Sequence, residues 1–318
     1  MSQCLYCYQE IEGSEKEFHG TCSRKIFGSP TPPFFEYRLD EMNELAKQVV
    51  ERSVTVPGVQ AKLSLHLDKE KSKPGRLTFV GLWGEYILKP PAKEYPELPE
   101  NEDLTMHLAE IFSIPVVPHT LIRLQSGELA YLSRRTDRDK QGKLHMEDMC
   151  QLTERLTEDK YKGSMEQVGK TIGKYSSNPL LDIVTFFELT VFSFLTGNAD
   201  MHLKNFSLID RRDELTGFTP AYDLLSTRLV IPEEDDPEEM ALMLNGRKRK
   251  FTLENFVNFG NLLVLNEKQI ENALEKFRKS IHHALEFVDK GFLSESKTEE
   301  YKKLIRNRAK RLKLITNE

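Results

Sequence analysis

The feature that most constrains the fold is a predominantly apolar run over residues 183–195, which ends just before Gly197. Such a run predicts a helix buried on nearly all sides, because a surface helix would carry one clearly polar face. The glycine is typical of the carboxyl end of a helix. The next segment, GNADMHLKNF (residues 197–206), is largely polar. The sequence therefore predicts a loop rich in functional groups, held at the end of a core helix.

Three side chains in and after this loop have the order of a phosphoryl-transfer site. In such sites an aspartate accepts the proton of the attacking hydroxyl, an asparagine a few residues on binds Mg²⁺, and an aspartate in a later loop binds the metal again. Asp200, Asn205 and Asp223 occur in that order. The Asp200 and Asn205 spacing is common by chance, so the argument depends on its position after the buried helix. We predict phosphoryl transfer from ATP, with Asp200 as the catalytic base.

Three of the four cysteines lie within the first 22 residues, in a pattern typical of a metal site. Two residues separate Cys4 from Cys7, and two separate His19 from Cys22. Two such pairs can meet around one tetrahedral Zn²⁺, with residues 8–18 forming a small hairpin or knuckle. The alternatives are a disulfide, which a reducing compartment disfavours, and free thiols in a disordered tail. Four protein ligands would make a closed structural site with no catalytic role.

The composition argues against two classes of protein. The chain is 39% hydrophobic and 30% charged, and its net charge of −5 disfavours a surface built wholly for nucleic acid. No apolar run reaches the ~20 residues that cross a bilayer, and the amino terminus lacks the charged-then-apolar form of a signal peptide. We therefore expect a cytoplasmic protein without a membrane partner.

The order of predicted elements indicates two lobes. We expect a helix after Asp40, a helix over 101–112, and strands over 62–67, 77–80, 86–89, 119–124 and 129–133. Beyond about residue 140 we expect helices, over 165–174, 181–196, 253–262, 267–288 and 298–314. The predicted class is α+β, with a two-lobed protein-kinase-like fold. Its parts are a zinc knuckle (1–28), a linker (29–38), a strand-rich amino-terminal lobe (39–138) and a helical carboxyl-terminal lobe (139–318).

Two segments of the strand-rich lobe are candidates for contact with phosphate. Residues 55–62 (TVPGVQAK) could bind phosphates through backbone amides, but they match no Walker loop, and an ordinary turn is the simpler interpretation. Lys89 ends an apolar strand, so its ammonium must either reach solvent or meet an anion. A nucleotide phosphate would serve, with Glu102 on the following helix holding the ammonium in place. A surface lysine at a strand end is the alternative.

Six segments occur together in a characteristic order. They are VPGVQAK (56–62), ILKP (87–90), RTDR (135–138), EDMCQ (147–151), the loop over 197–206, and TPAYDLLS (219–226). With these motifs the chain resembles the HipA family of serine/threonine kinases, the toxins of bacterial toxin–antitoxin systems. Six matches in register are far harder to reach by chance than any one of them.

The resemblance implies a role for each matched side chain. Asp200 is the expected catalytic base, Asn205 and Asp223 the Mg²⁺ ligands, and Lys89 a phosphate contact. The resemblance implies further ATP contacts in three places. The phosphate loop would contribute Pro57, Gly58, Val59, Gln60, Ala61 and Lys62, and an interlobe hinge that meets adenine would contribute Arg134, Arg135 and Thr136. The loops near the metal would contribute His202, Lys204 and Tyr222. Thr136 stands where an aromatic residue is usual in the family.

Regulation and partners follow from the same resemblance. Family members silence themselves by phosphorylating a hydroxyl before the phosphate loop, and the matching residue is Thr55, where serine is usual. Family substrates include aminoacyl-tRNA synthetases, and an antitoxin would link the protein to DNA indirectly. Because the phosphate loop begins near residue 55, the resemblance implies a short, split form whose small amino-terminal subdomain is a separate polypeptide. The zinc knuckle takes that place, and would dock a partner chain or steady the strand-rich lobe.

Two other functions fit the same residues. One is a nucleotide-binding, non-catalytic corepressor module, and the other is a small-molecule phosphotransferase. The intact set of Asp200, Asn205, Asp223 and Lys89 favours the protein kinase over the corepressor.

Overall fold

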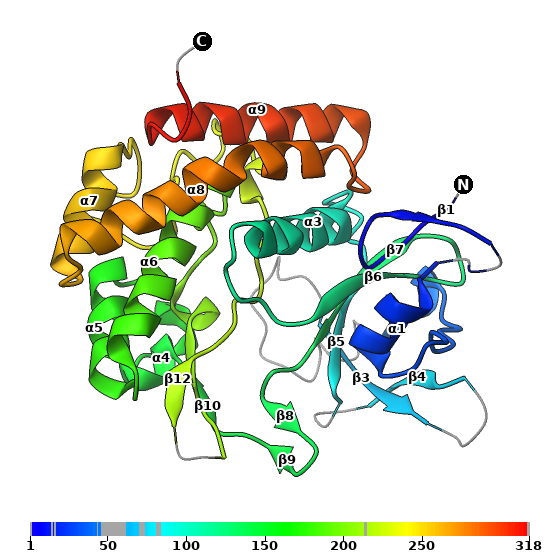
Figure 1. The fold of residues 1–318 in the computed structure, drawn as a ribbon. Helices are drawn as coiled ribbons and strands as arrows, with labels where there is room; N and C mark the ends of the chain where they lie inside the picture. Colours follow the sequence, from blue (N-terminus) through cyan, green and yellow to red (C-terminus); the bar gives the residue numbers. More distant parts are fainter. Residues whose placement is uncertain are drawn as a thin grey trace. The chain divides into compact units, whose positions relative to one another are not determined.

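A computed structural model of the chain describes residues 2–13, 15, 17–42, 44–45, 62–69, 74–80, 84–212 and 215–316. The chain divides into two compact units. Unit 1 comprises Met1–Asp103, Val117–Arg135 and Lys290–Leu293, and unit 2 comprises Leu104–Val116, Thr136–Asp289 and Ser294–Glu318. Strands predominate in unit 1 and helices in unit 2, so the predicted α+β class is confirmed (Figure 1).

Unit 1 contains a five-stranded antiparallel sheet with the order β4-β3-β5-β7-β6. Its strands are β3 (Leu63–Asp68), β4 (Arg76–Phe79), β5 (Tyr86–Lys89), β6 (His119–Arg123) and β7 (Leu129–Arg134). Leu63, Leu65 and Leu67 are buried at every second position of β3, because successive side chains of a strand point to opposite faces. All five strands lie within one residue of the predicted ends.

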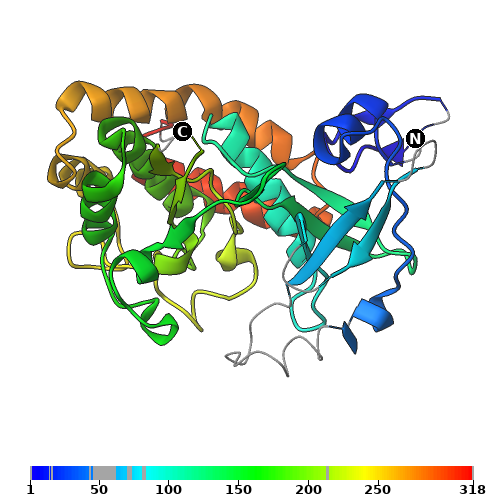
Figure 2. The same ribbon diagram turned by 90° about the horizontal axis from the view of Figure 1, so that it is seen from below.

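The rest of unit 1 surrounds this sheet. A two-stranded hairpin, β1 (Ser2–Gln3) with β2 (Glu10–Ile11), precedes α1 (Gly20–Phe27), which lies against the sheet in both ribbon views (Figures 1 and 2). Residues 39–42 and 44–45 are helical, as predicted after Asp40, and the rest of that predicted helix lies outside the described residues. The helix α3 (Leu98–Ile111) begins in unit 1, three residues before its predicted start, and its residues from Leu104 onward are assigned to unit 2.

Besides the second part of α3, the described residues of unit 2 form six helices and three short 3₁₀ turns. The helices are α4 (Met149–Leu152), α5 (Met165–Tyr175), α6 (Pro179–Thr196), α7 (Leu253–Leu262), α8 (Glu267–Val288) and α9 (Glu295–Arg311). The turns are η1 (Thr157–Asp159), η2 (Leu203–Asn205) and η3 (Thr227–Leu229). The helices α8 and α9 lie side by side, and both contact α6 (Figure 1). The predicted ends are exact for α7 and α8 and differ by at most three residues for α5, α6 and α9.

The expectation of an all-helical region beyond residue 140 is wrong in one respect. Unit 2 also holds a three-stranded antiparallel sheet, β10 (Met146–Asp148), β11 (Ser207–Asp210) and β12 (Thr216–Phe218), in that order. A second hairpin joins β8 (Arg138–Asp139) to β9 (Gly142–Lys143). These strands are too short to show an alternating pattern in the sequence.

The predicted core helix is α6. Residues 186–196 are buried without interruption, and Pro179 stands at the first helical position. By length and composition alone α6 could also cross a membrane. This differs from the expectation that no apolar run of the sequence is long enough to do so. Because residues 186–196 are buried among the other helices of unit 2, α6 is a core helix. The helix ends at Gly197, where φ is +77°.

Gly197 cannot be replaced without strain, which gives a prediction about stability. An added Cβ would meet Leu304 Cδ2 at 2.6 Å and Arg228 Cβ at 3.0 Å, in a backbone conformation that favours glycine. We expect Gly197→Ala to lower the free energy of unfolding by about 1–3 kcal/mol in urea titrations. The control is Gly173→Ala in α5, whose added Cβ makes only an ordinary 3.6 Å contact with Ile183. That change should stabilise by up to about 1 kcal/mol. Equal stability of Gly197→Ala and the unaltered protein would contradict the prediction.

Candidate functional site

The loop after α6 is held by the segment that contains η3. The Thr227 hydroxyl donates to Gly197 O at 2.9 Å and accepts from Ala199 N at 2.8 Å. Inside the loop, the Asn198 side chain accepts from Asp200 N at 3.1 Å. Backbone groups at the end of α6 have no partner within the helix, and these bonds supply one. The same bonds fix the backbone that carries Asp200.

Asn205 is bonded to the backbone of Asp200. Its Nδ2 group donates to Asp200 O at 2.9 Å, and its own N–H donates to His202 O at 2.9 Å. Asn205 is buried at the end of η2. Because the nitrogen of the carboxamide is bound by Asp200, the amide oxygen is the group left for a cation, and oxygen is the ligand that Mg²⁺ prefers.

Asp223 lies on a segment that is attached to this loop on both sides. On one side the Tyr222 hydroxyl lies 2.6 Å from Ser207 Oγ and donates to Lys204 O at 3.1 Å. On the other side Thr227 holds the start of the loop. Asp223 itself has a φ of +60°, which is uncommon for a residue with a side chain. Residues kept in such conformations cluster at functional sites, because the surrounding structure must hold them there.

Tyr161 holds the predicted catalytic base, and sequence reasoning missed it. Its hydroxyl donates to Asp200 Oδ1 at 2.7 Å, from 39 residues earlier in the chain. Its ring meets the ring of His202 edge-on, with centroids 5.1 Å apart. Burial, followed by the bond to Asp200, raises the pKa of Tyr161 well above its usual value. Burial lowers the pKa of His202, although the Asp200 carboxylate opposes the shift. No spacing pattern in the sequence connects Tyr161 with Asp200.

Lys204, a predicted ATP contact, is engaged by another group in this structure. Its ammonium lies 2.6 Å from Asp148 Oδ2. Asp148 also caps α4, where it and Gln151 form reciprocal bonds with the backbone. The pair therefore joins the end of β10 to the loop that carries Asp200 and Asn205.

In unit 1, the predicted pairing of Lys89 with Glu102 is confirmed. The ammonium lies 2.5 Å from Glu102 Oε1, and the two residues are 4% and 1% exposed. The ammonium also lies 5.4 Å from the centroid of the Tyr131 ring, on the neighbouring strand β7. Such burial excludes the surface-lysine alternative, because a buried ammonium is tolerated only when it is paired.

The predicted hinge and phosphate loop are only partly described. The chain passes from unit 1 to unit 2 between Arg135 and Thr136. Just before this point, Arg134 N donates to Pro118 O and Arg135 N to Glu85 O, each at 2.8 Å. Lys62 is exposed and directly precedes β3. The remaining predicted residues of this region, Thr55, Pro57, Gly58, Val59, Gln60 and Ala61, lie outside the described residues.

Cys4, Cys7, His19 and Cys22 come together in unit 1. Their ligand atoms all lie within 4.8 Å of one another, and all the cysteines are free thiols, so the disulfide alternative does not apply. His19 Nδ1 lies 3.4 Å from Cys7 Sγ and 3.8 Å from Cys22 Sγ. Its other ring nitrogen lies 3.0 Å from Glu10 O. A metal-binding histidine usually has such a backbone partner, which orients the ring.

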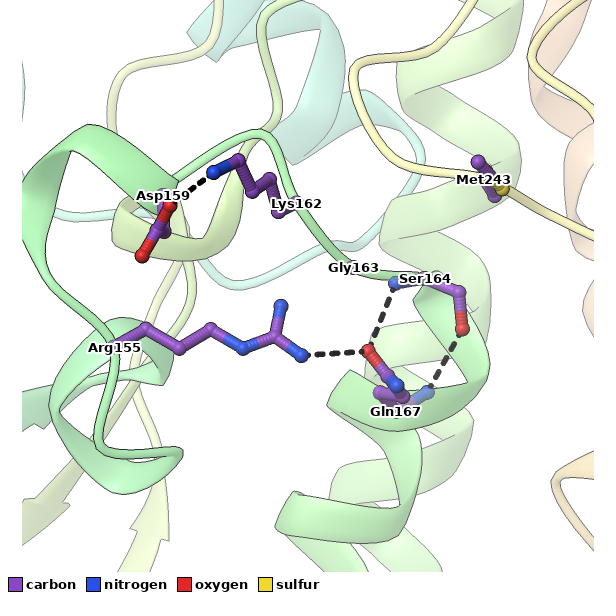
Figure 3. Close-up of a pocket in the computed structure, with 7 residues that line it drawn as sticks. All are labelled: Arg155, Asp159, Lys162, Gly163, Ser164, Gln167 and Met243. Atoms are coloured by element: carbon purple, nitrogen blue, oxygen red, sulfur yellow. Dashed lines mark hydrogen bonds and ion pairs between the residues drawn. The ribbon is translucent and has the colours of Figure 1, made fainter.

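A shallow depression of about 470 Å³ opens on unit 2, next to the segment that carries Tyr161 (Figure 3). Its polar side chains are bonded to one another: Lys162 to Asp159, and Gln167 to Arg155 (Figure 3). None of the residues predicted to bind ATP lines it. We therefore assign the depression no part in nucleotide binding.

Comparison with known proteins shows the family to which the chain is similar. Residues 54–285 match the family model of the HipA-like C-terminal domain. The chain is 32% identical over 271 residues to Y4dM of Sinorhizobium fredii, a protein named for an inferred kinase activity. The match covers 79% of this chain but 63% of that relative, so the chain spans less than two thirds of its length.

Solved structures show a shared fold at low sequence identity. A chain in the complex of HipA, HipB and operator DNA from the Shewanella oneidensis MR-1 toxin–antitoxin system matches with a TM-score of 0.67 at 21% identity, over 88% of this chain and 73% of that one. The Helicobacter pylori proinflammatory kinase CtkA matches with a TM-score of 0.55 at 15% identity, over 79% and 94%. The predicted kinase-like fold is confirmed.

The buried ion pair of unit 1 gives a prediction about stability. Glu102→Gln would leave a buried ammonium facing a neutral amide, so we expect the free energy of unfolding to fall by about 3 kcal/mol. Lys89→Met combined with Glu102→Gln should cost less than the sum of the single changes. Glu36→Gln is the control, because its 3.0 Å pair with Arg76 is exposed and should change stability by less than about 1 kcal/mol. Urea titrations measure the two single variants, Lys89→Met and Glu102→Gln, their combination, and Glu36→Gln. If the two single losses of unfolding free energy add up to the loss in the combined variant, Lys89 and Glu102 are not coupled.

Proposed function

The chain belongs to the HipA-like C-terminal domain family, and we propose that it is an ATP- and Mg²⁺-dependent serine/threonine protein kinase. The observation that carries the proposal is the loop cluster of unit 2. There Tyr161 holds the Asp200 carboxylate, Asn205 is bonded to the backbone of Asp200, and the segment of Asp223 is attached to the same loop.

Asp200 is the base of the proposed reaction. The acceptor hydroxyl loses its proton to the Asp200 carboxylate while its oxygen forms a bond to the γ-phosphorus of ATP. The bond between the γ-phosphorus and the bridging oxygen breaks, and ADP leaves with that oxygen. Tyr161 donates to one carboxylate oxygen, which fixes the rotation of the carboxylate and keeps the other oxygen for the acceptor. Tyr161 is thus a positioning residue.

Asn205 and Asp223 would hold Mg²⁺, since an amide oxygen and a carboxylate are the hard oxygen ligands that this ion prefers. The ion would neutralise charge on the phosphates of ATP. Lys89, kept in place by Glu102, would contact the phosphates as well. The remaining proposed contacts with ATP are Arg134, Arg135, Thr136, His202, Lys204 and Tyr222, with Lys62 and the loop before it; Lys204 would have to leave Asp148 to take part.

The proposed biological role is that of a toxin in a bacterial toxin–antitoxin system. The HipA, HipB and operator DNA complex supports an antitoxin partner and an indirect link to DNA. A translation component such as an aminoacyl-tRNA synthetase is the proposed substrate, and a separate protein like the family's small amino-terminal subdomain is a further proposed partner. Such a kinase would act in the cytoplasm, where ATP and its substrates are. Phosphorylation of Thr55 is the proposed means of self-inactivation, and it rests on the family resemblance alone.

The proposal also includes a structural zinc ion on Cys4, Cys7, His19 and Cys22. The support is the closeness of the four ligand atoms and the bond that orients the His19 ring. All four positions of a tetrahedral ion would be filled by the protein, so the site has no open position for catalysis.

The kinase proposal is tested with labelled ATP and a cell extract. We expect the unaltered protein to label a protein on serine or threonine, and Asp200→Asn to lower the rate at least roughly 100-fold, because the base is lost. Asp289→Asn, an exposed aspartate paired with Lys302 at 2.6 Å, is the control and should keep full activity. Mass spectrometry identifies the labelled protein and any modified residue of the kinase itself.

Each other outcome of this experiment has a definite meaning. Equal labelling by Asp200→Asn would refute the assigned base. ATP binding without transfer by the unaltered protein would favour the corepressor module. Labelling of small alcohols or aminoglycosides, with no labelled protein, would favour the small-molecule phosphotransferase.

The zinc proposal is tested by metal analysis of the purified chain. We expect one zinc ion per chain by plasma mass spectrometry, and a value near zero for Cys7→Ser, because three ligands hold the ion much less tightly than four. Cys150→Ser is the matched control, since Cys150 is buried in α4 of unit 2 and should leave the metal content unchanged. Equal zinc in the Cys7 and Cys150 variants would rule out the assigned site.

A further inference from the structure

We propose that the knuckle predicted over residues 1–28 positions the Lys89–Glu102 pair for nucleotide binding through a buried network that starts at Tyr8. The inference rests on the proposed function only for the role of Lys89. The network itself lies within unit 1 and can be tested without any catalytic activity.

The knuckle is bonded to the sheet at two places. Leu5 O accepts from Leu121 N at 3.2 Å and from the Thr120 hydroxyl at 3.0 Å, both on the edge strand β6. At the other end of the knuckle, the Tyr86 hydroxyl of β5 donates to Ile26 O at 2.9 Å. The knuckle is therefore a structural part of unit 1.

Tyr8 connects the proposed metal site to the interior. It directly follows Cys7, and its N–H donates to Cys4 O at 3.0 Å, so the turn that presents the two thiols also fixes the tyrosine. Its φ of +62° is a conformation that a tyrosine adopts only where the neighbouring structure imposes it. Its side chain is buried, and its hydroxyl donates to Asp103 Oδ2 at 2.7 Å.

Asp103 reaches Lys89 by two routes. Along α3, the preceding residue is Glu102, the carboxylate that binds the Lys89 ammonium at 2.5 Å. Across the sheet, the other oxygen of Asp103 lies 2.7 Å from His119 Nδ1. The His119 ring stacks on Tyr131 with centroids 6.1 Å apart, and the Lys89 ammonium lies 5.4 Å from the Tyr131 ring. A shift of Asp103 would therefore move both Glu102 and Tyr131, which lie next to the ammonium.

The geometry separates this network from the proposed chemistry. Successive side chains of a helix point about 100° apart, so Glu102 can face β5 while Asp103 faces the knuckle and β6. Tyr8 and Asp103 are assigned no contact with ATP or with the acceptor. They are positioning residues, and their effect should appear in the affinity for nucleotide.

The first test compares two variants that each remove one buried tyrosine hydroxyl. Tyr8→Phe keeps the ring and the metal ligands but loses the bond to Asp103. We expect zinc to stay bound, KM for ATP to rise roughly 5- to 10-fold, and kcat to change less than KM. Tyr86→Phe loses the bond to Ile26 and should lower the melting temperature without raising KM. If both proteins are active kinases and Tyr8→Phe has the same KM for ATP as the unaltered protein, the inference is overturned.

The second test needs no activity. Amide hydrogen exchange is followed by mass spectrometry in the full chain, with zinc bound, after zinc removal by a chelator, and in Tyr8→Phe. We expect faster exchange at residues 98–103 and in β6, with α5 to α9 unchanged. This result in a chain without kinase activity would support the network and reject the proposed function. Unchanged exchange at residues 98–103 in Tyr8→Phe would reject the network whether or not the chain is a kinase. If zinc removal unfolds the chain, the Tyr8 variant decides alone.

Discussion

The burial of α6 is the constraint on which unit 2 depends. Residues 186–196 are all buried, and the polar side chains in this stretch have partners. Glu188 pairs with Lys276 at 2.6 Å, and the buried Arg308 of α9 binds Phe194 O near the end of the helix. A helix held in this way cannot shift or lengthen without exposing apolar surface or breaking these bonds. The loop that begins at Gly197 therefore starts from a fixed point, as a site built on precise side-chain positions requires.

The sequence predicted what depends on neighbouring residues, and missed what depends on distant ones. The amino-terminal ends of α7 and α8 are predictable because each begins at a capping box, at Thr252 with Asn255 and at Asn266 with Gln269. The Lys89–Glu102 pair was predictable because an ammonium at the end of a buried strand needs an anion. The strands β10 to β12 and the bond from Tyr161 to Asp200 left no local pattern, since long-range packing alone creates them.

The interior of unit 1 differs from that of unit 2 because it contains a group of buried charged and polar side chains. Unit 1 buries Lys89, Glu102, Asp103 and His119, and charged or polar groups away from water are tolerated only when each has a well-placed partner. The knuckle supplies one of these partners, the Tyr8 hydroxyl, and its Leu5 carbonyl pairs with the edge strand β6. Covering an edge strand also removes a surface on which another chain could add a strand. One small module thus completes both the polar interior and the border of the sheet.

The two units therefore hold their functional groups by different means. In unit 2, the backbone that carries Asp200 and Asn205 is fixed mainly by bonds between side chains and backbone groups, and the Asp200 carboxylate is held by one side chain, that of Tyr161. In unit 1, Lys89 is fixed by side chains that contact other side chains, and one such bond is lost with a single substitution. A side-chain network is also the arrangement that a bound metal or partner can alter without refolding the unit. Control of the proposed nucleotide site is for this reason more accessible from the knuckle than from the loop that carries the base.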